Sequence, residues 1–272
     1  MDERVSMFTW KPSFCDAFPN LCWLRTRKMK LNSYNFLLGL AFASAVVAPA
    51  TQAEIVIHGT RVIYPSDARE VTLQVSNNGS KPALVQAWLD EGDSKSTPDQ
   101  SKVPFMIAPP ISRVEATKSQ TLRITALPTA SQLNQKQETV LWLNVLDIPP
   151  RPTSKTENTT PDNFLQLAIR SRIKFFYRPA SIKDDANLAA DKLQWVKSGQ
   201  NLTVKNPTPF HITMTSVYQK AGDKKVDLLP QGLMIKPFSE ESVQLKNGNL
   251  QDMSFMNVND YGGRVEHQIK LQ

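Results

Sequence analysis

Residues 164–176 read FLQLAIRSRIKFF, a segment in which apolar and polar side chains alternate. Its first apolar members, Leu165, Leu167 and Ile169, share one parity, and alternation of this kind predicts a β-strand with one apolar face. The preceding residues 151–163 contain no apolar residue except proline and are predicted to form a loop. A long strand beside such a loop invites pairing with other chains if it lies at the edge of a sheet. A central strand with one buried face is the alternative.

Shorter runs with strand character recur on both sides of this segment, separated by turn and loop residues. The runs before it are residues 55–57, 62–64, 71–75, 84–89, 121–124 and 140–146. The runs after it are residues 193–196, 202–204, 211–218, 228–235, 241–245 and 265–271. About seven short strands make one sandwich. The chain is therefore predicted to be all-β, with two β-sandwich domains.

The first 53 residues are predicted to be a secretory signal region. Four Lys or Arg residues between positions 25 and 30 precede the nearly unbroken apolar run 36–48, and Thr51-Gln52-Ala53 supplies a small-residue cleavage site. The apolar run is short for a membrane span, and polar residues follow it. Translation from Met29 instead of the first residue stays open as an alternative start.

The length of the chain and its two sets of strands predict two modest domains after the signal region. Pro179 cannot extend a ladder and polar residues follow at 183–185, so the boundary between the domains is placed there. The predicted limits are residues 1–53 for the signal region, 54–179 for the N-terminal domain and 184–272 for the C-terminal domain.

Both cysteines, Cys15 and Cys22, lie in the signal region, so cleavage would leave an exported chain without cysteine. Such a chain cannot rely on disulfides, and each domain must be stabilised by burying its own core. The same region holds six Lys or Arg against three Asp or Glu, so its removal lowers the formal net charge from +7 to +4. This mild excess argues against a general basic face for nucleic acid.

Little in the exported residues points to catalysis or to a bound cofactor. Their histidines, His58, His211 and His267, lack the spacing of a metal site. The sequence also has no glycine-rich phosphate loop and no serine elbow. It therefore predicts no enzyme, no metal, no cofactor and no small-molecule substrate. An exported adhesin or secreted interaction module with the same composition stays open as an alternative.

Seven short blocks carry a resemblance that composition does not show. They are Thr60-Arg61, Val85-Gln86-Ala87-Trp88, Ala108-Pro109-Pro110, Ile148-Pro149-Pro150-Arg151, residues 172–180, Asn206-Pro207-Thr208-Pro209-Phe210 and residues 259–263. In this order and spacing they resemble the PapD-like periplasmic pilus (fimbrial) chaperones of the chaperone–usher pathway. The resemblance covers essentially all of residues 54–272. It implies a periplasmic protein with two immunoglobulin-like β-sandwiches joined by a short hinge in an L shape.

The resemblance also implies how the chain would act. Chaperones of this family lend a strand to a pilus subunit whose own immunoglobulin fold lacks its last strand, and they release the subunit at an outer-membrane usher. By resemblance, Leu165, Leu167 and Ile169 would fill the open groove of the subunit while the backbone completes its sheet. The implied partners are pilus subunits and the usher. Self-association of the free chaperone through the same strand stays open.

Two further groups of residues take their roles from the resemblance. Arg61 and Lys174 match the basic pair that anchors the C-terminal carboxylate of the subunit, where two cations would fix the register of the bound strand. Without the resemblance, two solvated surface cations would be expected at these positions. Glu138, Arg178 and Asp260 match a network of charges that connects the two domains.

Overall fold

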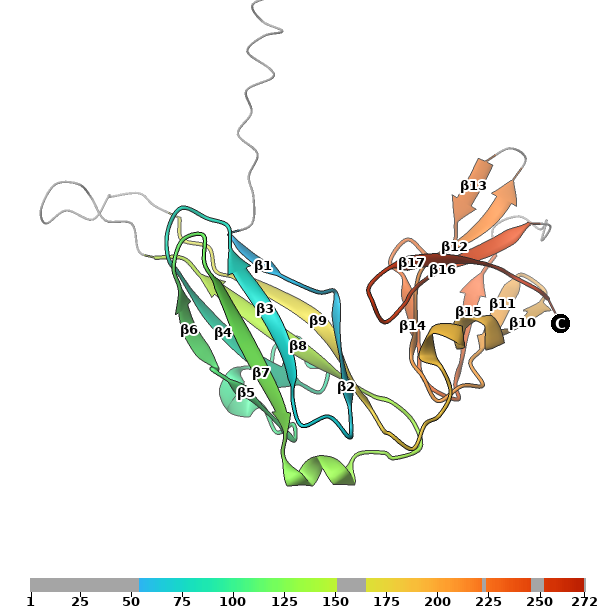
Figure 1. The fold of residues 1–272 in the computed structure, drawn as a ribbon. Coiled ribbons are helices and arrows are strands. Elements are labelled where there is room, and N and C mark those ends of the chain that lie inside the picture. The colour runs from blue at the N-terminus through green and yellow to red at the C-terminus, as the bar shows by residue number, and fades with distance from the viewer. Residues whose placement is uncertain (1–53, 151–164, 222–223, 246–251, 272) are drawn as a thin grey trace, which may run out of the picture. The chain divides into compact units, whose positions relative to one another are not determined.

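The computed structural model describes residues 54–150, 165–221, 224–245 and 252–271 (Figure 1). The predicted signal region and the predicted loop 151–163 lie outside these residues. Four β-sheets and a few short 3-10 helices account for the regular structure that is described. No helix in the described ranges is long and apolar enough to cross a membrane.

The first sandwich consists of a four-stranded and a five-stranded sheet. The four-stranded sheet has the order β1 (Ile55–Ile57), β3 (Val71–Asn77), β7 (Ser119–Ala126) and β5 (Phe105–Ala108). The five-stranded sheet has the order β2 (Arg61–Pro65), β9 (Ile169–Arg178), β8 (Thr139–Ile148), β4 (Ala83–Asp90) and β6 (Ile111–Val114). Short 3-10 helices, η1 (Pro98–Gln100) and η2 (Pro128–Gln132), lie in the connections.

Both sheets contribute to one apolar core in this sandwich. Val75 and Ile124 of the four-stranded sheet belong to the same buried cluster as Leu143 and Phe175 of the five-stranded sheet. Tyr64 packs edge-on against an aromatic neighbour in this core, and its hydroxyl accepts a hydrogen bond from the backbone N–H of Ala126 at 3.0 Å. Buried apolar side chains from both sheets, together with this hydrogen bond, therefore connect the two layers of the sandwich.

The second sandwich is smaller and has its own core. One sheet has the order β10 (Gln194–Ser198), β11 (Asn201–Lys205) and β15 (Glu240–Gln244). The other has the order β13 (Lys224–Asp227), β12 (Ile212–Ala221), β16 (Met253–Val258) and β17 (Arg264–Gln268), with β14 (Leu233–Ile235) also on β12. The 3-10 helices η3 (Ala186–Leu188) and η4 (Ala190–Lys192) precede them. Trp195, Leu202, Met214 and Phe255 are among the residues of its buried cluster.

The two-sandwich, all-β fold class is confirmed, but several strand limits were predicted wrongly. Strands β5 and β6 flank Pro109-Pro110, which the sequence suggested to be a loop. The predicted run 228–235 is a strand only from Leu233, and β13 and β16 were not predicted. β16 is buried at four of its six positions, including three in a row, so it lacks the alternation by which the other strands were recognised.

The strand predicted at 164–176 begins later than expected. β9 starts at Ile169, whereas residues 165–168 have no regular structure. The neighbouring strand explains this limit, because β8 pairs Asp147 with Ile169 and ends one residue later, before Pro149-Pro150. Proline has no N–H to donate, so this ladder cannot continue alongside residues 165–168.

The two halves of β9 have different neighbours. Antiparallel pairing with β8 runs along β9 from Ile169 to Tyr177, but parallel pairing with β2 begins only where Arg61 lies opposite Lys174. No described residue pairs with the other edge of residues 169–173. β9 is therefore an edge strand in its first half and a central strand in its second half. The two alternatives for this strand in the sequence, an edge strand and a central strand, each hold for one half.

Candidate functional site

An uncovered row of apolar side chains lies at the start of β9 and in the four residues before it. Leu165, Leu167 and Ile169, together called the apolar row, are 81%, 62% and 53% exposed. Further along β9, Phe175 and Tyr177 have the same parity as Ile169 and are buried in the core of the first sandwich. The apolar row thus continues in sequence from a core strand into solvent, and contiguous apolar surface of this kind usually marks an interaction site.

The two predicted anchor residues, Arg61 and Lys174, lie directly opposite each other on neighbouring strands. Neighbouring strands are about 4.8 Å apart, so the bases of the two side chains are close together. Each also contacts the second sandwich: Arg61 Nη1 donates to the carbonyl of Val258 at 2.9 Å, and Lys174 Nζ donates to Thr213 Oγ1 at 3.0 Å. The pair marks the point where the free edge of β9 ends and β2 begins.

Both cations of this pair are partly withdrawn from water. Burial, and secondarily the charge of Arg61, lowers the pKa of Lys174 from 10.5 to about 8. Burial also lowers the pKa of Arg61, although the charges of Asp260 and Glu138 oppose this shift. Arg61 Nε is buried and finds no hydrogen-bond partner among the described residues. A carboxylate placed between the two side chains would favour the charged form of both.

A cavity of about 380 Å³ adjoins Lys174 and provides room for such a group. Trp142 of β8 and Thr213 of β12 line it beside the lysine, and residues 230–234 form another part of its wall. The ring of Trp142 also lies 5.8 Å from the ammonium of Lys174. Lys174, the one member of the basic pair that lines this cavity, therefore faces a space that a chain end could enter.

Glu138, Arg178 and Asp260 are brought together as the resemblance implies. The guanidinium of Arg178 donates to Asp260 through two nitrogens, at 2.6 and 3.0 Å, and to Glu138 Oε1 through Nε at 2.8 Å. Glu138, only 2% exposed, also accepts from the backbone N–H of His211 at 2.9 Å. Burial opposes the charge of Arg178, but hydrogen bonds and ion pairs with both carboxylates outweigh it and raise its pKa. The role of this network in orienting the domains stays a prediction.

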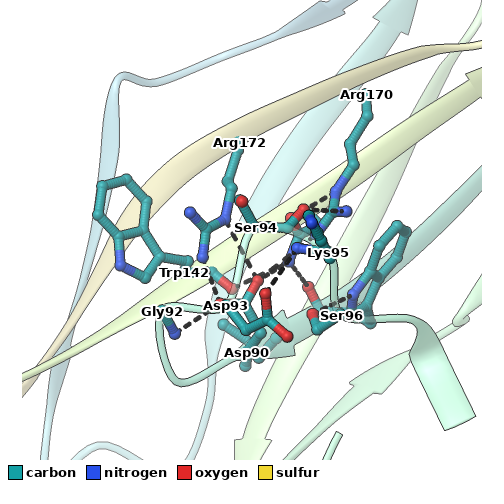
Figure 2. A network of polar contacts seen from close by, with 12 residues as sticks. Asp90, Gly92, Asp93, Ser94, Lys95, Ser96, Trp142, Arg170 and Arg172 are labelled. Atoms are coloured by element: carbon teal, nitrogen blue, oxygen red, sulfur yellow. Dashed lines mark hydrogen bonds and ion pairs between the residues drawn. The ribbon is translucent and has the colours of Figure 1, made fainter. Parts of the chain in front are cut away.

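A second charge network, which was not predicted from the sequence, lies on the outer face of the five-stranded sheet (Figure 2). Asp90, at the end of β4 and 3% exposed, accepts hydrogen bonds from the guanidinium of Arg172 at both carboxylate oxygens. Arg170 completes the network: its Nε donates to Asn144 Oδ1 at 2.9 Å, and its Nη2 lies 3.6 Å from Asp90 Oδ2. Burial raises the pKa of Asp90, but hydrogen bonds from Arg172, Asn144 and the Gly92 backbone outweigh it, so its pKa is lowered.

The chain matches two described protein families over most of its length. Residues 54–183 match the pili and flagellar-assembly chaperone, PapD N-terminal domain, and residues 188–269 match the pili assembly chaperone PapD, C-terminal domain. The chaperone protein MrkB of Klebsiella pneumoniae is 41% identical over 220 residues, which are 80% of this chain and 91% of that protein.

Two solved structures support the same assignment. The YadV chaperone is 38% identical with a TM-score of 0.66, and the match covers 80% of this chain and 100% of that chain. A chain in the complex of the Salmonella enterica SafA pilin with the SafB chaperone is 30% identical with a TM-score of 0.66, covering 82% and 99%. These relatives are named as chaperones and not as enzymes. The resemblance found in the sequence is confirmed, and the chain belongs to the PapD-like family of pilus-assembly chaperones.

Proposed function

We propose that this protein is a periplasmic chaperone that captures pilus subunits by donor-strand complementation and delivers them to an outer-membrane usher. β9 would complete the sheet of the subunit, and Arg61 with Lys174 would anchor the C-terminal carboxylate of the subunit. The observation that carries the proposal is the free edge of residues 169–173, which ends at this basic pair.

The free edge offers backbone groups for strand addition. Its N–H and C=O groups can pair with any extended chain, so this part of the recognition tolerates different subunit sequences. The exposed apolar row can then enter pockets of the subunit, because side chains of a strand alternate between its faces. Backbone pairing and apolar burial together suit a partner that lacks one strand of its own fold.

The charges at the end of the edge select one direction for the incoming strand. A strand that occupies the free edge lies in line with β2 and must end where β2 begins, at Arg61. A strand parallel to β9 brings its C-terminal carboxylate to Arg61 and Lys174, whereas an antiparallel strand brings its α-ammonium there. Two partly desolvated cations attract the first and repel the second. The geometry and the charges therefore favour parallel addition with a carboxylate anchor.

Relatives support pilus subunits as the partner. The SafB chaperone was solved with a pilin bound, and this chain is 30% identical to a chain in that structure. Membership of the family supports the usher as a further partner, and together with the predicted signal region it supports the periplasm as the location. An exported adhesin, the alternative from composition, would not need a basic pair at the end of an open strand edge.

Co-expression with a pilin of the same organism tests the proposal. The chaperone should copurify with the pilin from periplasmic extract and keep it soluble. Arg61→Ala and Lys174→Ala should each give folded protein that no longer captures the pilin. Lys225→Ala is the matched control, because this exposed lysine of β13 contacts Glu266 and the ring of Tyr218, both in the second sandwich. Normal capture by both anchor variants, or recovery of the protein at the cell surface without pilin, would contradict the proposal.

A further inference from the structure

The open part of β9 carries two arginines, which is unusual for a strand edge that must accept another chain. Long charged side chains on an edge strand are a common means of preventing strand addition. Arg170 and Arg172 both lie within residues 169–173, where β9 has no second neighbour among the described residues. If these side chains extended over the edge, they would obstruct an incoming strand.

Both arginines instead reach away from the free edge, across β8 (Figure 2). The guanidinium of Arg172 lies 4.4 Å from the ring centre of Trp142 in β8 and binds Asp90 in β4. Arg170 lies 4.7 Å from the ring centre of Trp88 in β4. Its Nη1 also donates to the carbonyl of Ser94, in the segment after β4, at 2.8 Å. The partners of both arginines therefore lie on β8, on β4 or just after it.

Asp90 determines the side of β9 to which both arginine side chains extend. It is the carboxylate to which both guanidinium groups are ion-paired, and it is almost fully buried. A buried carboxylate is strongly destabilising without a cation, so the two arginines are held over β8 whether or not a subunit is present. Bidentate pairing and stacking also fix the planar guanidinium of Arg172 in one orientation.

We propose that Asp90 is a positioning residue for subunit capture: it retains Arg170 and Arg172 across β8 and so keeps the free edge of β9 open to an incoming strand. This inference rests on the proposed function, since it concerns how the same edge is prepared for its partner. It assigns a role to residues outside the anchor pair and the apolar row.

Three variants separate this role from a contribution to stability alone. Asp90→Asn removes the carboxylate with which both arginines pair and leaves them with only neutral partners among the described residues, such as Asn144 and Trp142. It should lower the association rate constant for a copurifying pilin by about tenfold, a change typical of altered access and electrostatics at an interface. Asp90→Asn with Arg170→Gln and Arg172→Gln removes the side chains that obstruct the edge. This triple variant should associate within about twofold of the wild-type rate, even where its melting temperature stays lowered. Asp90→Asn with Arg172→Gln leaves Arg170 as the one free arginine, in the sense that it has no carboxylate partner, and its association rate should lie between those of the other two variants.

The control is Ile124→Val, which truncates a buried side chain of the other sheet and lowers stability but leaves Asp90, Arg170 and Arg172 unchanged. It should associate at the wild-type rate. Equal association of Asp90→Asn and wild type would overturn the inference, as would a triple variant as slow as Asp90→Asn. If Asp90→Asn does not fold, the variant with one free arginine and the triple variant give the same comparison. Failure of wild type itself to capture the pilin would instead refute the proposed function.

Discussion

The depressed pKa of Lys174 predicts that subunit binding weakens as the pH rises from 7 to 9. In the free protein this side chain loses its proton near pH 8, because it is partly buried and lies beside Arg61. A bound carboxylate stabilises the ammonium form and raises the pKa back toward 10.5. Binding at pH 9 must therefore take up a proton, and the free energy of that uptake reduces the affinity.

The size of the effect follows from the two pKa values. If binding restores the full shift, the dissociation constant at pH 9 is about tenfold larger than at pH 7, and about 0.9 proton is taken up. Lys174 is only partly buried, so screening by solvent reduces the expected change to about three- to tenfold. Arg61 stays charged throughout this range.

Isothermal titration calorimetry can measure both quantities, with the C-terminal strand of a captured pilin as a synthetic peptide. Two buffers with different ionisation enthalpies report the proton uptake. Lys174→Arg is the matched control, because arginine stays charged and should give an affinity that is flat between pH 7 and 9. A peptide with an amidated end should bind weakly at every pH. A flat profile for wild type, or the same decrease in Lys174→Arg, would refute the reasoning.

Three further predictions concern the apolar row, the second network and the free protein. Replacing all three residues of the apolar row by serine should reduce the free energy of binding by about 3–6 kcal/mol, because each buried side chain contributes about 1.5–3 kcal/mol, scaled here by its exposed fraction. Calorimetry measures this loss, and an unchanged melting temperature shows that folding is intact. Asp260→Ala leaves Arg178 with Glu138 alone, and thermal unfolding should show a loss of about 1–3 kcal/mol, whereas the apolar row stays in place. The pKa of Lys174 is lower in the folded protein than in the unfolded chain, so between pH 8 and 10.5 the unfolded chain binds more protons. The free energy of unfolding should therefore increase over this range, by about 1–2 kcal/mol after screening by solvent. Denaturant titrations measure this increase, and Lys174→Met should abolish it.

The sequence predicts the fold where one face of a strand is buried. Strands β3 and β4 have alternating burial over much of their length, so their residues could be recognised from polarity alone. β16 could not, since it is buried at most positions and contains serine and asparagine. The start of β9 was predicted wrongly because alternation continues through residues 165–168, while the ladder is ended by the prolines that follow β8.

The site depends on contacts that spacing along the chain does not reveal. Arg61 and Lys174 become neighbours only through the parallel register of β2 and β9, so their pairing could be expected from the family resemblance alone. The sequence did not indicate a role for Asp90, because an acidic residue at the end of an apolar run is typical of the first residue of a turn. Its partners, Arg170 and Arg172, lie on β9, far from Asp90 in sequence. The sequence showed only that these two residues are basic and lie two positions apart.

The start of β2 also has a consequence for how many different subunits one chaperone can serve. Under the proposed function, a bound strand must stop at Arg61, so each of its residues has a set distance from that point, at about 3.3 Å per residue. A subunit would then be accepted when the number of residues between its C-terminus and its open groove matches the distance from the basic pair to the apolar row. Subunits with unrelated sequences but equal spacing could share this chaperone, and one inserted residue before the C-terminus would exclude an otherwise suitable subunit.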